Sequence, residues 1–176
     1  MDDITSTGPL RTQHATADGH DPAAREAFKA IDRAMVGDSD VLEVGCGAGA
    51  MAERINALPG VRLVAVDWSE SSVTQTAARG VDARRADVCY LPFEDDTFDV
   101  VHAGWMLHHV RDLDRALAEV RRVLRPGGTF VALTDGETRH FSSENGEFTL
   151  TRRFSDVRRQ DLEMPDGDDV TVFEAR

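Results

Sequence analysis

The feature that most constrains this 176-residue chain is an alternation of short apolar segments with segments of helical spacing. The apolar segments "DVLEVG", "VRLVAVD", "TFDVVHAG" and "TFVALTD" are typical of strands, and "VDARRAD" is a weaker example. Between them, "SESSVTQTAARG" and "DLDRALAEVRRVLRPGG" are typical of helices. Alternation of this kind predicts an α/β fold, a parallel sheet with helices on both faces.

Residue types mark the expected ends of two helices. Asp21 suits an N-cap and Pro22 a first helical position, so a helix is expected to start there. The three residues from Pro126 to Gly128 are expected to stop the later helix. The residues expected to form the packed faces of these two helices are Ala24, Phe28, Ile31, Met35, Leu113, Leu117, Val120 and Leu124.

The end of the chain breaks the alternation. "FSDVRRQDLEM" and "DDVTVFEAR" flank the turn-like "PDGD", which predicts an antiparallel hairpin at one edge of the sheet. Residues 1–20 are mostly polar and are expected to be a flexible tail. We therefore expect one domain over residues 21–176.

Charge and cysteine content narrow the function classes. The net charge is −12, from 32 acidic and 20 basic residues, which disfavours binding to nucleic acid or to an anionic membrane. The two cysteines lack metal-type spacing, and neither a signal pattern nor a membrane-length apolar run is found. We expect a cytoplasmic protein whose partner is a small molecule.

The first strand leads into the glycine-rich stretch "VLEVGCGAGAM". In an open parallel sheet, ligands bind beyond the carboxyl ends of the strands, and glycine lets a ligand approach the backbone closely. Asp67 ends the next strand, where its carboxylate can accept hydrogen bonds from ribose hydroxyls. The spacing Gly45-x-Gly47-x-x-Ala50 also fits a dinucleotide, so this loop alone leaves the cofactor open.

Three further features favour S-adenosyl-methionine over a dinucleotide. Glu43 precedes the loop, where a carboxylate would repel a pyrophosphate but can help to hold an ammonium group. Asp87 is expected at the end of the third strand, where it can accept from an adenine amino group. The antiparallel hairpin is also not how a dinucleotide-binding half-domain ends.

Four stretches, which carry the family's motifs in order, resemble the class I S-adenosyl-methionine-dependent methyltransferases, of the compact small-molecule type (methyltransferase type 11-like). They are "VLEVGCGAG", "VAVDWSE", "ADVCYLPFEDDTFDVVHAGWMLHHV" and "EVRRVLRPGGTFVALTD", and together they cover residues 41–135. The resemblance implies a Rossmann-like, doubly wound sheet of seven strands with the last strand inserted antiparallel. It also implies methyl transfer from S-adenosyl-methionine to an O, N or C atom of a small molecule.

The resemblance further implies roles for individual residues. It places part of the site near the methionine moiety, one residue on the ribose hydroxyls and others around the adenine. The methionine group comprises Glu43, Gly45, Cys46, Gly47 and Gly49, with the backbone of Ala103 facing the methionine amine. The ribose residue is Asp67, and the adenine residues are Trp68, Asp87 and Val88.

Methyl transfer is an in-line displacement that mainly requires alignment, and a general base is needed only for a poorly acidic acceptor. His108 and His109 are the candidate bases, although neighbouring side chains diverge and at most one can point squarely into the pocket. Trp105 is a candidate to face the sulfonium or to pack in the core, and His140 is a second candidate substrate residue. No metal is expected, because the acidic run "FEDDTFD" is interpreted as a solvated turn.

The acceptor is not encoded in any recognisable motif. The segments that the family uses for substrate recognition are short here, which leaves a cofactor-binding partner or regulatory subunit as the alternative function. A nicotinamide-dependent oxidoreductase is a third. Residues 1–20 and the loop over residues 136–153 are expected to close over the site, unless a second subunit of a homodimer covers it.

Overall fold

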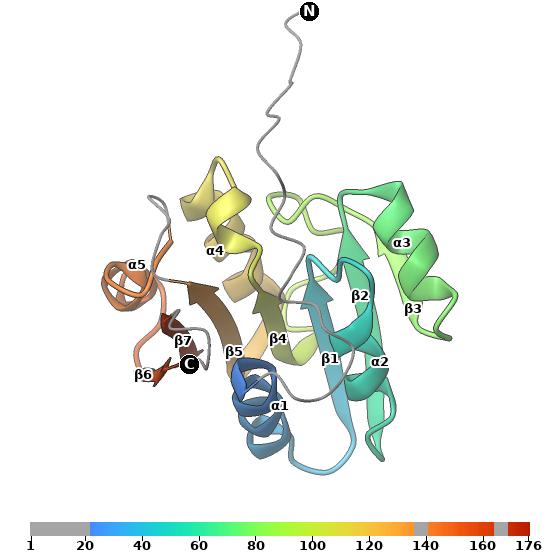
Figure 1. The fold of residues 1–176 in the computed structure, drawn as a ribbon, viewed down its shortest axis with the longest axis horizontal. Coiled ribbons are helices and arrows are strands. Elements are labelled where there is room, and N and C mark those ends of the chain that lie inside the picture. The colour runs from blue at the N-terminus through green and yellow to red at the C-terminus, as the bar shows by residue number, and fades with distance from the viewer. Residues whose placement is uncertain (1–21, 136–140, 164–168) are drawn as a thin grey trace, which may run out of the picture.

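The computed structural model describes residues 22–135, 141–163 and 169–176. They form a seven-stranded sheet of order β3-β2-β1-β4-β5-β7-β6, drawn in Figure 1. The strands on the β3 side of β7 pair in parallel, whereas β7 is antiparallel to both β5 and β6, so the predicted sheet and its hairpin strands are confirmed. The strands are β1 (Ser39–Val44), β2 (Val61–Asp67), β3 (Asp82–Arg85), β4 (Phe98–Gly104), β5 (Leu124–Asp135), β6 (Val157–Glu163) and β7 (Asp169–Ala175).

Helices cover both faces of the sheet. One buried cluster joins α1 and α2 to the sheet, and the other joins α4 and α5 to its opposite face. The helices are α1 (Pro22–Ala34), α2 (Ala50–Asn56), α3 (Glu70–Ala77), α4 (Leu113–Val123) and α5 (Gly146–Thr151), with a short 3-10 helix, η1 (Leu107–His109). No helix in the described ranges is long and apolar enough to cross a bilayer.

The packed face of α1 differs from the predicted one. Ile31 is fully buried as expected, but Phe28 and Met35 are only half-buried. The other fully buried positions are the alanines Ala23, Ala27 and Ala30. Small side chains allow the helix backbone to lie close to β5 and β7, which rotates the contact face toward the alanines.

The junction between α4 and β5 also differs from the prediction. The helix ends at Val123, and Leu124 already pairs with Phe98 as the first residue of β5. Pro126 and Gly128 therefore lie within the strand, where the pairing with β4 is irregular. Burial of Leu124 beside β4 ends the helix before the proline is reached.

The sequence predicts a loop over residues 136–153, after β5, but part of this segment is helical. Residues 146–151 form α5, and Phe141 and Leu150 on either side of its start are fully buried. A Cβ atom added at Gly146 would lie 2.6 Å from the ring of Phe173, so glycine permits this close packing on β7. The expected flexible tail, the cap Asp21, the hairpin turn and residues 136–140 lie outside the described residues.

Candidate functional site

The glycine loop lies at the carboxyl end of β1 and is fastened to β2. The backbone N–H groups of Gly45 and Cys46 both donate to the carbonyl of Val66, over 2.8 and 3.2 Å. Gly49 then caps α2 with φ 81°. This arrangement turns the backbone of the loop toward the edge where the parallel strands end.

The three glycines of the loop have different surroundings. A Cβ atom added at Gly45 would lie 2.7 Å from the side chain of Met106, and one at Gly49 would lie 2.9 Å from the Cα atom of Thr76. One added at Gly47 would have no described atom within 4 Å. Gly47 is therefore the position of the loop that leaves room for a ligand against bare backbone.

Asp67 ends β2 as predicted, and its carboxylate binds the loop. Its Oδ2 atom accepts a hydrogen bond from the N–H of Gly47 over 2.9 Å, and its Oδ1 atom accepts from the N–H of Ser69 over 2.8 Å. Each carboxylate oxygen retains further acceptor capacity for a ligand hydroxyl. The sequence indicates a ligand contact for Asp67 but not its hydrogen bond to the loop.

Thr76 of α3 and Arg79, which follows the end of that helix, also hold the loop and were not singled out from the sequence. The hydroxyl of Thr76 lies 3.1 Å from the carbonyl of Gly47, to which it donates, and Arg79 Nε donates to the carbonyl of Ala48 over 2.8 Å. In the sequence they are ordinary polar positions of an amphipathic helix. Their contacts depend on how α3 packs beside the loop, which spacing does not encode.

Glu43 lies beneath this loop, one residue before the end of β1, and is 3% exposed. Within the described part of the chain its Oε2 atom has no hydrogen-bond partner. Burial, with the negative charge of Asp67 as a smaller cause, raises the pKa of Glu43 to about 8. A buried carboxyl that lacks a donor suits a ligand that brings a cationic N–H group, such as the ammonium of S-adenosyl-methionine.

The adenine side of the predicted site is arranged differently from the expectation. β3 ends at Arg85, so Asp87 does not close the strand but lies in the turn that follows, where its Oδ1 atom accepts from the N–H of Cys89 over 2.8 Å. Val88 is buried in the core. Trp68 is 68% exposed, and the guanidinium of Arg85 lies 5.4 Å from its ring centroid.

The segment after β4 passes directly over the glycine loop. Ala103 is fully buried and pairs with Val44 of β1, while Trp105 has φ 50° and packs against the α1 side of the core. Met106 contacts the loop at Gly45, as described above. η1 follows at once and carries the two candidate bases.

The paired histidines of η1 have different exposures. The ring centroids of His108 and His109 lie 4.0 Å apart; His109 is exposed and His108 is half-buried. His102 is a core residue: its Nδ1 lies 3.2 Å from the carbonyl oxygen of Val131, and burial lowers its pKa to about 4. His140 lies outside the described residues.

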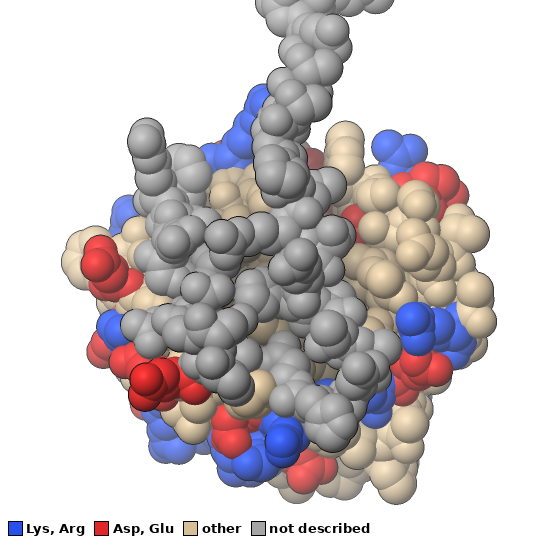
Figure 2. Space-filling model, in the orientation of Figure 1, with Lys and Arg blue, Asp and Glu red and all other residues tan. Residues whose placement is uncertain are grey.

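On the face shown in Figure 2, the described charged side chains do not gather by sign. Figure 2 shows acidic and basic side chains interspersed around the margin of the face it displays. The acidic run is exposed at Asp95 and Asp96, while the rings of Phe93 and Phe98 meet edge to face 5.0 Å apart, as the solvated-turn interpretation predicted.

Comparison with known proteins identifies the family. Residues 42–132, just over half of the chain, match the methyltransferase domain family. The chain is 37% identical over 100 residues to the mitochondrial arginine-hydroxylase NDUFAF5 of Danio rerio, and 33% identical over 116 residues to the sterol 24-C-methyltransferase erg6 of Schizosaccharomyces pombe. These alignments cover 55% and 61% of this chain but 31% of each relative, so the chain spans about a third of their length.

A solved structure shows the same fold. The [4+2]-cyclase SpnF superposes with a TM-score of 0.76, at 18% identity, over 87% of this chain and 80% of that one. At this identity the likeness shows the architecture alone, whereas the domain match over residues 42–132 includes the glycine loop, Asp67 at the end of β2 and Asp87 in the turn after β3. The chain belongs to the class I S-adenosyl-methionine-dependent methyltransferase family, and its cofactor is S-adenosyl-methionine.

Proposed function

We propose that this chain transfers the methyl group of S-adenosyl-methionine to an O, N or C atom of a small-molecule acceptor. The observation that carries the proposal is Glu43, a buried carboxyl without a described donor, directly before a loop with open space at Gly47. A dinucleotide would bring a pyrophosphate toward this carboxyl and be repelled, whereas an amino-acid ammonium would be attracted to it.

Named residues would hold the cofactor as follows. Glu43 would accept from the ammonium, and Gly47 would present its bare backbone to the methionine part. Asp67 would accept from the ribose hydroxyls with the acceptor capacity that the loop leaves free. Asp87 and the exposed ring of Trp68 would bind the adenine.

Bound S-adenosyl-methionine supplies an electrophilic methyl group on a positively charged sulfonium. The acceptor atom forms a bond to the methyl carbon as the carbon–sulfur bond breaks, and S-adenosyl-homocysteine leaves. The protein contributes alignment of the two molecules and a site from which water is excluded. Where the acceptor carries a proton, a histidine of η1 would remove it.

We expect His109 rather than His108 to act as this base, because His109 is the more exposed of the two. His109→Ala should then lower kcat by roughly 10²- to 10⁴-fold, the usual contribution of a general base, while the affinity for S-adenosyl-homocysteine stays the same. If neither histidine substitution changes kcat more than about threefold, alignment alone drives the transfer.

Two measurements test the proposed function. Calorimetric titration with S-adenosyl-methionine, S-adenosyl-homocysteine and NAD should give saturable binding for the first two, and tighter binding of NAD would exclude the assignment. Incubation with small-molecule extracts and methyl-labelled cofactor should yield a product heavier by one methyl group. Cofactor binding without any labelled product, except when a second protein is added, would favour a regulatory subunit.

The curated relatives give a reason to keep the product analysis open. One relative is named as an arginine hydroxylase and another as a sterol methyltransferase, so proteins similar to this one differ in the reaction. The product should therefore be identified by mass. An added oxygen in place of an added methyl group would exclude the proposed transfer.

A further inference from the structure

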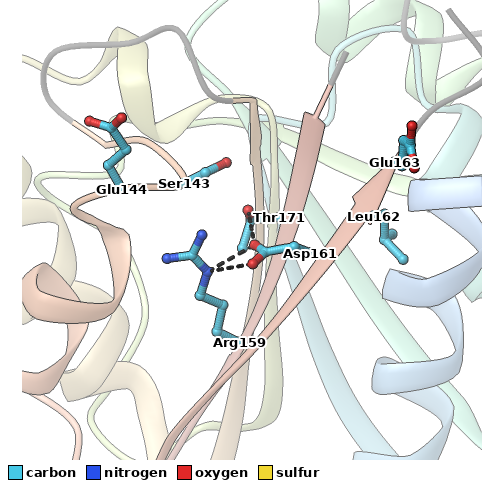
Figure 3. Close-up of a pocket in the computed structure, with 7 residues that line it drawn as sticks. All are labelled: Ser143, Glu144, Arg159, Asp161, Leu162, Glu163 and Thr171. Atoms are coloured by element: carbon cyan, nitrogen blue, oxygen red, sulfur yellow. Dashed lines mark hydrogen bonds and ion pairs between the residues drawn. The ribbon is translucent and has the colours of Figure 1, made fainter. Parts of the chain in front are cut away.

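A second hollow lies on the same edge of the sheet, away from the glycine loop. It has a volume of about 480 Å³ and lies between the turn before α5 and the strands β6 and β7 (Figure 3). A volume of this size is typical of small-molecule pockets. Its lining is mostly polar: Ser143, Glu144, Arg159, Asp161, Leu162, Glu163 and Thr171.

A buried hydroxyl in this pocket has no hydrogen-bond partner in the described part of the chain. Ser143 is 7% exposed, and among the residues described its Oγ atom has no partner. In Figure 3 this atom is directed toward the space between Ser143 and Thr171. Burying an unpaired hydroxyl costs free energy, so the arrangement suits a ligand that completes the hydrogen bond.

Some of the charged side chains that line the pocket form an ion pair with each other, and others do not pair with any described side chain. Asp161 accepts from Arg159 Nε over 2.8 and 3.1 Å and from the hydroxyl of Thr171 over 2.7 Å, so that guanidinium is paired. Glu144 and Glu163 have no ion pair with any described side chain. The pocket is therefore acidic in a chain whose net charge is −12, which favours a cation over an anion.

We propose that this pocket binds the ammonium or guanidinium group of a small molecule. The hydroxyl of Ser143 accepts one N–H of the cation, and the carboxylates of Glu144 and Glu163, which lie on opposite sides of the pocket in Figure 3, add negative charge that attracts it. Arg159 keeps its Nε hydrogen bonds to Asp161 and so holds the carboxylate of Asp161 beneath the cation.

The place of the pocket in the sheet relates it to the transfer site. Thr171 pairs with both Asp161 and Thr134, and Leu133, the residue before Thr134, pairs with Gly104 at the end of β4. β7 lies two strands away from β4, and neighbouring strands are ~4.8 Å apart. Thr171 therefore lies about 10 Å from the end of β4. If the proposed methyl transfer holds, a cationic acceptor of that length would be anchored here at its far end.

The binding step can be tested without turnover. Agmatine, which carries one ammonium and one guanidinium, is the probe, and the whole chain is titrated by calorimetry at low ionic strength. Saturable binding is expected, weakened several-fold by Glu144→Gln or by Glu163→Gln, since each removes one negative charge from the pocket. The matched control is Glu94→Gln, an exposed carboxylate outside the pocket that should bind agmatine like the wild type.

Ser143→Ala separates a ligand site from a structural role. It removes an unpaired hydroxyl, so the variant should be as stable as the wild type or more so, yet bind agmatine several-fold more weakly. No saturable agmatine binding, an equal loss in Glu94→Gln, or tighter binding of acetate than of agmatine would overturn the proposal. Parallel titration with S-adenosyl-homocysteine reports on the cofactor site, so failure of one site is distinguishable from failure of the other.

Discussion

At the scale of single residues, the glycine loop combines packing and binding in neighbouring positions. Positions 45 and 49 require glycine, because a Cβ atom at Gly45 would overlap Met106 and one at Gly49 would overlap Thr76. Gly47 has φ 54° and open space among the described atoms. A motif that is uniform in sequence therefore has different physical requirements at each glycine.

Gly47→Ala and Gly45→Ala should separate these roles. Gly47→Ala should cost ~1–2 kcal/mol of stability, the strain of a left-handed residue, and weaken S-adenosyl-homocysteine binding at least about tenfold by filling the ligand space. Gly45→Ala should lose roughly 1–3 kcal/mol more through overpacking against Met106. Urea unfolding and calorimetry measure both effects, and normal cofactor affinity in Gly47→Ala would contradict the assignment.

Glu43→Gln should change stability and binding in opposite directions. The pKa of Glu43 is about 8 in the folded protein, above its ordinary 4.5, so this group contributes stability below pH 4.5 and loses it as the pH rises through 8. A neutral glutamine should raise the unfolding free energy at pH 8 by on the order of a few kcal/mol. The same change should weaken S-adenosyl-homocysteine binding, because the ammonium loses its carboxylate.

The pH dependence of binding is a second readout of the same residue. Affinity of the wild type should increase toward pH 8 as Glu43 ionises, and Glu43→Gln should lack this increase. Calorimetry in buffers of different ionisation enthalpy should detect proton release on binding to the wild type. Equal pH profiles for the two proteins would show that Glu43 does not meet the ammonium.

At the scale of elements, one arginine of α4 holds the segment between β3 and β4. Arg122 donates through Nη1 to the carbonyl of Phe93 over 2.7 Å and through Nη2 to that of Leu91 over 3.0 Å. Its Nε and Nη2 atoms also donate to Glu119, whose Oε2 accepts from the N–H of Leu91. The turn that carries Asp87 is thereby connected to a helix rather than supported only by its own chain.

Arg122→Ala should release this segment. The loss of charge-assisted bonds to partly buried carbonyls should lower the unfolding free energy by roughly 1.5–3 kcal/mol and weaken S-adenosyl-homocysteine binding by loosening the turn at Asp87. Arg121→Ala, the exposed neighbour on the same helix, is the control and should change neither quantity appreciably. Equal hydrogen-exchange protection of residues 87–93 in the two variants would contradict this role.

At the scale of the whole molecule, the ion pairs and the buried carboxyl of Glu43 change the stability in opposite directions as the pH changes. Hydrogen bonds from Arg62, Arg122 and Arg159 lower the pKa values of Asp40, Glu119 and Asp161, in that order. Each contributes stability that is lost as the pH falls through the lowered pKa. Glu43 acts in the opposite direction, and the net charge of −12 adds repulsion at high pH.

The thermal midpoint of the cofactor-free protein should therefore be highest on the acid side of neutrality. Glu43→Gln should move the maximum of the thermal midpoint toward neutral pH, because it removes the contribution of Glu43 to stability, which decreases between pH 4.5 and 8. Calorimetric scans at a series of pH values measure the shift. A wild-type maximum above pH 8 would show that Glu43 is not buried as an acid.

Much of the fold and of the site could be predicted from the sequence. The parallel sheet, Asp67 at the end of β2 and the antiparallel last strands follow from apolar periodicity and from residue types next to one another in the chain. Local spacing does not set every helix boundary. The end of α4 and the start of α5 depend on the burial of Leu124 and Phe141 against strands that are distant in the chain.

The sequence by itself determined the order and direction of the elements, because helical and strand periodicity are properties of contiguous residues. It also placed Glu43, Gly47 and Asp67 at one edge, since parallel strands end on the same side. Only the tertiary structure decided which glycine stays open, that Thr76 holds the loop, and that Ser143 is buried beside β7. Those features arise where segments far apart in the chain pack together, and residue spacing along the chain carries no record of such contacts.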